Sequence, residues 1–139
     1  MLIEDNPDHV LLTQAVLELC PRVRQVMVIG DGEQALSYIR TDAASSPALH
    51  LPGLVLLDLK LPKVDGLDVL RAIRASPVWQ RVPVVVLSTS TRPADIEACY
   101  AGGANAYLSK VAAPEALNTQ ICALADYWLN RAAAPGEEL

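Results

Sequence analysis

Two hydrophobic runs in the middle of the chain constrain its fold more than any other feature. "LVLLD" covers residues 54–58 and "VPVVVLS" covers residues 82–88, and both are nearly unbroken series of aliphatic side chains. A strand that faces solvent on one side alternates apolar and polar residues, whereas a strand covered on both faces is apolar throughout. The two runs therefore predict buried strands of a parallel sheet.

Segments with helical spacing alternate with these runs. The expected strands span residues 2–3, 24–29, 54–58, 82–88 and 106–110. The expected helices span residues 8–19, 31–39, 66–76, 92–101 and about 114–130. In the first helix one face carries the apolar residues Leu12, Ala15, Val16 and Leu19. Strict alternation of strands and helices implies a doubly wound α/β domain.

Composition and charge narrow the class of protein. The chain has 139 residues and is 52% hydrophobic, which is enough for one domain with a real core. Its 11 basic and 16 acidic residues give a net charge of -5, which argues against nucleic acid as a partner. No apolar run approaches the ~20 residues of a membrane span, and no signal peptide is visible. We therefore expect a cytoplasmic protein.

The cysteines are scattered along the chain. Cys20, Cys99 and Cys122 show neither a CxxC pattern nor nearby histidines at zinc-ligand spacing. We expect them to be reduced and mostly packed thiols rather than disulfide partners or metal ligands.

The ends of the chain and one internal segment lack regular patterning. Small and polar residues at 40–53 predict a loop, and "AAAPGEEL" at 132–139 predicts a flexible tail after a single domain over 1–131. Only three residues precede Glu4, so we expect upstream residues to complete the first strand. The 29 residues after Lys110 are too few for a DNA-binding unit, so output through a protein contact is expected.

Charged and polar side chains stand where the predicted strands end. They are Glu4, Asp5, Asp58, Ser88 and Lys110. In doubly wound sheets the ligand site lies beyond the carboxyl ends of the strands, so these residues should meet at one rim. Clustered carboxylates repel one another unless a cation lies among them, and oxygen ligands suit Mg²⁺ or Mn²⁺. The alternative for the acidic pair is simple capping of the first helix.

A cation beside a partly exposed carboxylate suits phosphoryl transfer. Asp58 would be the nucleophile, and the hydroxyl of Ser88 and the ammonium of Lys110 would donate to the phosphoryl oxygens. Taken singly, each donor has an ordinary alternative, because a serine at a strand end is usually a turn residue and a lysine there is usually solvated.

Four motifs resemble one known family. "ED" at 4–5, "LLDLKLPKVDG" at 56–66, "PVVVLSTS" at 83–90 and "GANAYLSK" at 103–110 are similar, in order and spacing, to the signatures of the receiver domain of two-component response regulators. The resemblance implies a flavodoxin-like α/β fold, with a five-stranded parallel sheet in the order 2-1-3-4-5 and five helices. It also implies a phosphoacceptor rather than an ordinary enzyme, with self-catalysed phosphorylation and dephosphorylation.

The same resemblance implies roles for individual residues. Asp58 would accept a phosphoryl group from a partner histidine kinase, and Ser88 and Lys110 would bind its oxygens. The implied ligands of Mg²⁺ (or Mn²⁺) are Glu4, Asp5, Asp58 and the backbone carbonyl of Lys60.

Three further residues have expected roles in switching or in tuning the site. Tyr107 would be an aromatic switch that rotates inward when Ser88 is drawn toward the phosphoryl group. Lys60 and Ser90 would tune the site, since a cation two residues after the phosphoacceptor overlooks the phosphoryl group. Output would pass through the surface of the helix at 92–101, the strand at 106–110 and the helix at 114–130. Because Tyr127, Trp128 and Leu129 follow one another there, we expect an exposed apolar side chain and a homodimer through this surface.

Within the family, "EDNP" at 4–7 and the long loop before the third strand resemble single-domain regulators that partner bacterial and cyanobacterial phytochromes. A phytochrome-type kinase and a downstream phosphotransfer or effector protein are therefore the expected partners.

The sequence departs from the family pattern at Val111, which stands where the family usually has a proline in a cis bond. We therefore expect a trans peptide with a rearranged loop or a strained cis one.

Two other functions are compatible with parts of the pattern. A receiver-like docking module would not accept phosphate, and the intact set of Asp58, Ser88 and Lys110 argues against it. A phosphatase of the haloacid dehalogenase type would need a second aspartate two residues after Asp58, and Lys60 stands there.

Overall fold

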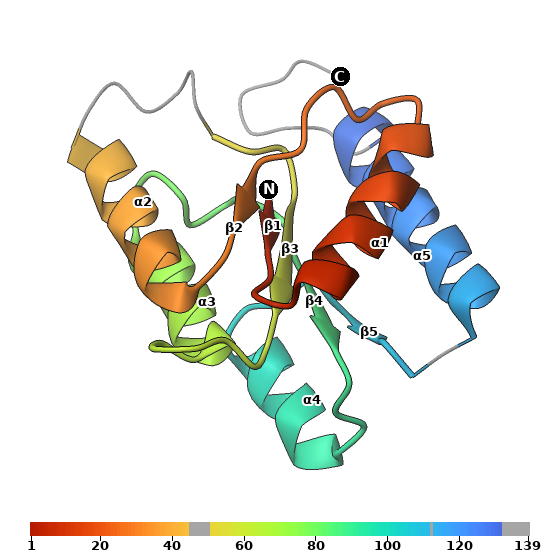
Figure 1. Ribbon diagram of the computed structural model, residues 1–139. Coiled ribbons are helices and arrows are strands. Elements are labelled where there is room, and N and C mark those ends of the chain that lie inside the picture. Colours follow the sequence, from red (N-terminus) through yellow and green to blue (C-terminus); the bar gives the residue numbers. More distant parts are fainter. Residues whose placement is uncertain (45–50, 112, 132–139) are drawn as a thin grey trace.

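The computed structural model describes residues 1–44, 51–111 and 113–131 and contains a parallel sheet in the strand order β2-β1-β3-β4-β5 (Figure 1). The strands are β1 (Leu2–Ile3), β2 (Val28–Ile29), β3 (Val55–Asp58), β4 (Val84–Ser88) and β5 (Ala106–Ser109). The helices are α1 (Pro7–Leu19), α2 (Gly32–Ala44), α3 (Gly66–Ala75), α4 (Pro93–Ala101) and α5 (Pro114–Asp126), and a π-helical turn (Tyr127–Arg131) follows α5. This order and alternation confirm the predicted flavodoxin-like fold.

The central strands are covered on both faces, as their hydrophobic runs predict. Val55 and Leu57 pack toward α2, α3 and α4, whereas Leu56 packs toward α1 and α5 (Figure 1). Successive residues of a strand point to opposite faces, so each face of the sheet builds its own core. Leu70 and Ile73 of α3 are fully buried in the first of these cores.

The buried face of α1 differs from the apolar face seen in the sequence. Leu12 and Leu19 are 68% and 83% exposed, whereas Thr13 and Leu17 are buried. The helix is apolar around most of its circumference, so periodicity alone does not select the side that packs. Contact with α5 and the sheet selects the stripe of Thr13 and Leu17, and an apolar surface is left facing solvent.

Element bounds also differ in places from the sequence expectation. Only Val28–Ile29 of the expected strand at 24–29 pairs with β1, and α2 continues to Ala44 into the segment expected to be a loop. The predicted tail at 132–139 lies outside the described residues. No helix in the described part of the chain combines the length and the apolar character that crossing a membrane requires.

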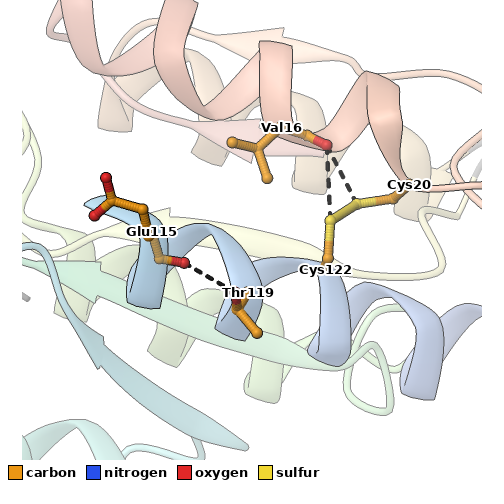
Figure 2. The surroundings of a disulfide bond; sticks show 5 residues. All are labelled: Val16, Cys20, Glu115, Thr119 and Cys122. Atoms are coloured by element: carbon orange, nitrogen blue, oxygen red, sulfur yellow. Dashed lines mark hydrogen bonds between the residues drawn. A yellow bond between two sulfur atoms is a disulfide. The ribbon is translucent and has the colours of Figure 1, made fainter. Parts of the chain in front are cut away.

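The expectation of reduced thiols is wrong for two of the cysteines. Cys20 and Cys122 form a disulfide between the end of α1 and the middle of α5, and both sulfurs lie near the carbonyl oxygen of Val16 (Figure 2). The two cysteines are 102 residues apart in sequence, and only the packing of α1 beside α5 brings their Cα atoms to 5.8 Å. Cys99 is a buried free thiol.

One arginine forms hydrogen bonds with several loops at the end of the sheet where the strands β4 and β5 begin. Arg74, at the end of α3, donates from Nε to the carbonyl of Gly103 at 2.9 Å and from Nη1 to those of Gln80 and Val82 at 3.0 and 2.7 Å. Its Nη2 donates to Oδ1 of Asn105 at 2.9 Å. The start of β4 and the loop before β5 are thereby held to α3.

Candidate functional site

The carboxyl ends of four neighbouring strands bring the predicted residues to one rim. Glu4 directly follows β1, Asp58 ends β3, Ser88 ends β4 and Lys110 directly follows β5. The pairing between β3 and β4 aligns Asp58 with Leu87, so the phosphoacceptor candidate and Ser88 are close neighbours at this edge. The structure thus places these residues at one edge of the sheet.

The acidic side chains of the rim form a compact cluster. Carboxylate oxygens of Glu4, Asp5 and Asp58 lie within 4.8 Å of one another. Glu4 is 2% exposed and Asp58 is 9% exposed, whereas Asp5 is open to solvent. The cluster therefore has a buried floor and an open side, through which a small ion or a phosphoryl donor can approach.

Lys110 bridges two of the carboxylates. Its Nζ atom lies 2.6 Å from Oε1 of Glu4 and 3.5 Å from Oδ2 of Asp58. The backbone N–H of Lys110 donates to the carbonyl of Ser88 at 2.8 Å, which fixes the residue at the end of the sheet. The ammonium is thus held within reach of any group attached to Asp58.

Burial changes the acidity of Asp58. Desolvation and the neighbouring Glu4 carboxyl group raise its pKa from the ordinary 3.8 to about 7, and the positive charge of Lys110 opposes the rise only in part. In addition, Oε2 of Glu4 is buried and has no hydrogen-bond partner among the described residues. Crowded carboxylates with an unpartnered oxygen are a donor set that fits a divalent cation.

A consequence of the raised pKa can be tested on metal-free protein. Between pH 4 and pH 7 folded Asp58 keeps a proton that the unfolded chain has lost, so its contribution to stability falls as pH rises through this window. We expect Asp58→Asn, which cannot ionise, to gain about 1 to 2 kcal/mol relative to the natural protein between pH 5 and pH 8, after allowance for screening at the open rim.

The measurement is urea unfolding with EDTA at the two pH values. The same substitution at Asp68, an exposed residue of α3, is the control. An Asp58→Asn gain that is equal at pH 5 and pH 8 would contradict the raised pKa.

Ser88, Ser90 and Tyr107 are connected through the loop that follows β4. Ser88 is fully buried, and its hydroxyl oxygen accepts from the N–H of Ser90 at 3.1 Å. The hydroxyl of Ser90 donates to the carboxylate of Asp95, and the half-buried Tyr107 donates from its hydroxyl to the carbonyl of Ser90 at 2.7 Å. A chain of hydrogen bonds therefore runs from Ser88 through Ser90 to Tyr107.

Lys60 and Val111 are both exposed beside residues of the rim. The side chain of Lys60 is exposed, and its backbone N–H lies 3.4 Å from Oδ1 of Asp58. The peptide bond between Lys110 and Val111 is trans, which is the first of the two conformations expected from the sequence. The N–H of Val111 donates to Oγ of Ser109 at 3.2 Å, which anchors the start of this loop.

Sequence reasoning missed two residues of α1 that face the rim. His9 lies with Nδ1 2.9 Å from Oε1 of Glu4, and Thr13 borders a gap beside Glu4, Asp58 and Lys110 that is too small to hold a water molecule. The two are four residues apart, which places them on one side of a helix. This spacing can be seen in the sequence, but it indicates that the two residues face the rim only once the buried face of α1 is known.

A glycine packs directly behind Asp58. A Cβ atom on Gly66 would lie 2.3 Å from the carbonyl oxygen of Asp58 and 2.8 Å from Cα of Leu59. The N–H of Gly66 donates to the carbonyl of Leu59 at 2.9 Å, and Oδ1 of Asp65 accepts from the N–H of Leu67 to start α3. The turn after β3 therefore closes tightly and leaves the Asp58 carboxylate free on its outer side.

Comparisons with known proteins agree with this geometry. The model of the response regulator receiver domain family matches residues 1–122. The probable methanogenesis regulatory protein FilR2 of Methanothrix harundinacea is 38% identical over 98% of this chain and 86% of its own length. Response regulator Rcp1 of Synechocystis is 34% identical over 97% of this chain and 91% of its own length.

Solved structures give the same result. The structure of the phosphorylated cyanobacterial phytochrome response regulator RcpA has a TM-score of 0.83 and 37% identity, and covers 97% of this chain and 96% of that chain. The structure of Rcp1 in its Mn²⁺-bound form has a TM-score of 0.82 and 33% identity with the same coverage. The chain therefore belongs to the response regulator receiver domain family of two-component systems.

Proposed function

We propose that the protein is a single-domain response regulator that accepts a phosphoryl group on Asp58 from a histidine kinase. The observation that carries the proposal is the rim itself, where Asp58 lies between a carboxylate cluster suited to a cation and the ammonium of Lys110, 3.5 Å away. The domain would extend over residues 1–131. Its position in the family supports this reading, and the exposed side of the cluster supplies the entry path for a donor.

The chemistry follows from the placement of the charges. An oxygen of Asp58 attacks phosphorus, and the new O–P bond forms as the bond from phosphorus to the donor's histidine nitrogen breaks and leaves its electron pair on that nitrogen. Lys110 moves from Glu4 toward the phosphoryl oxygens, and the Ser88 hydroxyl donates to them. A phosphorylated Asp58 hydrolyses again in the same site, which makes both steps self-catalysed.

The donor set favours Mg²⁺ as the natural cation, with Mn²⁺ as a substitute. A bound ion would supply positive charge that offsets the charge of the carboxylates and of the phosphoryl group. The residues that would hold it are Glu4, Asp5, Asp58 and the backbone carbonyl of Lys60. Lys60 is exposed beside Asp58, where its ammonium would tune how long the phosphoryl group survives, and Ser90, in the loop after β4, would contribute to the same tuning.

Signal output is proposed to follow from Ser88 and Tyr107. When Ser88 turns to the phosphoryl group, the hydrogen bond of Tyr107 to the Ser90 carbonyl is released and the ring moves inward. A near-complete switch needs roughly 5.5 kcal/mol of preference, and charge-assisted bonds from Ser88 and Lys110 are each worth ~1.5 to 3 kcal/mol. The surface of α4, β5 and α5 changes as a result.

Partners can be proposed from the same surface and from the relatives. Tyr100, Val111 and Tyr127 are large apolar side chains exposed on or beside α4, β5 and α5, which supports a homodimer through this surface. Relatives described as phytochrome response regulators support a phytochrome-type kinase, and membership of the receiver domain family supports a cytoplasmic location. A downstream phosphotransfer or effector protein would read the altered surface.

Intact mass after incubation with acetyl phosphate or phosphoramidate tests the phosphoacceptor role. With Mg²⁺ we expect a gain of one phosphoryl group, and with EDTA we expect no gain. Asp58→Ala should abolish the adduct, whereas the matched control Asp68→Ala, on the exposed side of α3, should keep it. A natural protein that forms no adduct at any donor concentration would instead favour the docking module.

A further inference from the structure

His9 lies at the rim and has no part in the chemistry proposed above. It occupies the first turn of α1, where its backbone N–H lies 3.3 Å from Oδ1 of Asn6, the residue that caps the helix. Its side chain is 38% exposed, and its Nδ1 atom is 2.9 Å from Oε1 of Glu4. The cap therefore holds the ring in contact with a buried carboxylate of the cluster.

The two oxygens of Glu4 have different surroundings. Oε1 is contacted by Nδ1 of His9 and by Nζ of Lys110, at 2.9 and 2.6 Å, whereas Oε2 has no hydrogen-bond partner among the described residues. Donors on Oε1 fix the rotation of the carboxylate and hence the direction of Oε2. Groups that orient a metal ligand in this way generally affect affinity for the metal.

His9 and Lys110 also contact each other, with Nδ1 and Nζ 3.1 Å apart. A neutral imidazole nitrogen either carries a hydrogen and donates or lacks one and accepts. Nδ1 can therefore accept from Lys110 or donate to Glu4, but it cannot do both at once. When Lys110 is present, Glu4 already has a strong donor; when Lys110 leaves, only the histidine remains beside Oε1.

We infer that His9 is a positioning residue that keeps Glu4 oriented toward the cation once Lys110 has moved to the phosphoryl group. This inference rests on the proposed function, because it requires a cation at the cluster and a phosphoryl group on Asp58. In the unphosphorylated protein Lys110 and His9 share the task. In the phosphorylated protein His9 donates from Nδ1 to Oε1 of Glu4 and is the one residue that keeps this carboxylate oriented.

The test compares affinity for Mg²⁺ with and without beryllofluoride, which mimics the phosphoryl group on an aspartate. His9→Leu removes the donor, His9→Gln retains an amide donor, and Gln14→Leu is a matched polar-to-leucine control on the same helix. The dissociation constant of Mg²⁺ is measured by calorimetry or by shifts of backbone amide resonances. Thermal unfolding of each variant without metal shows that the fold is retained.

With beryllofluoride we expect His9→Leu to weaken Mg²⁺ binding about tenfold, which is the low end for loss of a group that orients a metal ligand. Without it we expect a change below about threefold, because Lys110 still contacts Glu4. His9→Gln should retain most of the affinity for Mg²⁺ that His9→Leu loses. Gln14→Leu should bind Mg²⁺ as tightly as the natural protein. A merely structural role of His9 would weaken binding equally in both states and would show no rescue by glutamine.

Two results would overturn the inference, and they are distinguishable. If the natural protein binds Mg²⁺ and beryllofluoride and His9→Leu binds both equally well, the role of His9 is wrong and the phosphoacceptor function stands. If the natural protein binds neither, the proposed function fails and the inference fails with it.

Discussion

Reduction of the disulfide between Cys20 and Cys122 is expected to lower the free energy of unfolding by about 3 to 5 kcal/mol. A cross-link restricts the unfolded chain, and the effect grows with the length of the closed loop. Here the bonded residues are 102 positions apart, so the link joins nearly the two ends of the domain. For a loop of about 100 residues the chain-entropy treatment gives ~4.7 kcal/mol, and engineered and natural examples commonly give less.

Urea unfolding with and without dithiothreitol measures this effect. The control is the double variant Cys20→Ala and Cys122→Ala, which retains the buried thiol of Cys99 and should unfold at the same urea concentration in both conditions. The natural protein without reductant should unfold at a clearly higher concentration. An identical midpoint for the natural protein in both conditions, together with three free thiols by titration of the unreduced protein in denaturant, would refute a stabilising cross-link.

Gly66→Ala is expected to lower the free energy of unfolding by about 3 kcal/mol and to slow phosphorylation of Asp58. The added methyl would meet the carbonyl oxygen of Asp58 at 2.3 Å, and the neighbouring Cα and carbonyl oxygen of Leu59 lie at 2.8 Å. These are backbone atoms, which cannot rotate away as a side chain can, so the cost is at the upper end for overpacking. Relief of the clash has to displace the end of β3 and the carboxylate that it carries.

The matched control is Gly30→Ala, because a Cβ at that position has no atom of the described structure within 4 Å. Urea unfolding should separate the two variants by most of the predicted difference. The rate of adduct formation with acetyl phosphate, measured on folded protein, should fall for Gly66→Ala alone. Equal stability and equal rates for both variants would contradict the tight closure behind Asp58.

The fold could be predicted because the strands β3 and β4 are buried on both faces. Continuous apolar runs such as residues 82–88 are compatible with few structures other than a parallel sheet, and alternation with helices then sets the architecture. The buried face of α1 could not be predicted in the same way. Leu12 and Leu17 are equally apolar, and only the position of α5 decides that Leu17 is the one that packs.

The candidate site could be predicted where a polar or charged side chain stands at the end of a strand. Asp58 and Ser88 stand out because each ends a buried apolar run, Lys110 follows the last strand, and parallel strands bring such ends together. His9 and the cysteine pair give no such signal, since their meaning depends on contacts between helices. The disulfide in particular requires knowledge that α1 and α5 lie side by side.

The hydrogen bonds of Arg74 limit how the proposed output surface can move. They hold the start of β4 and the loop before β5 at the end of the sheet far from Asp58. At the rim, by contrast, the side-chain contacts of Lys110 are with Glu4, Asp58 and His9, and in the proposed mechanism the ammonium exchanges Glu4 for the phosphoryl group. If α4 and β5 rearrange as proposed, we therefore expect a tilt about the Arg74 end, with displacement growing toward Asp58, rather than a sliding of whole elements.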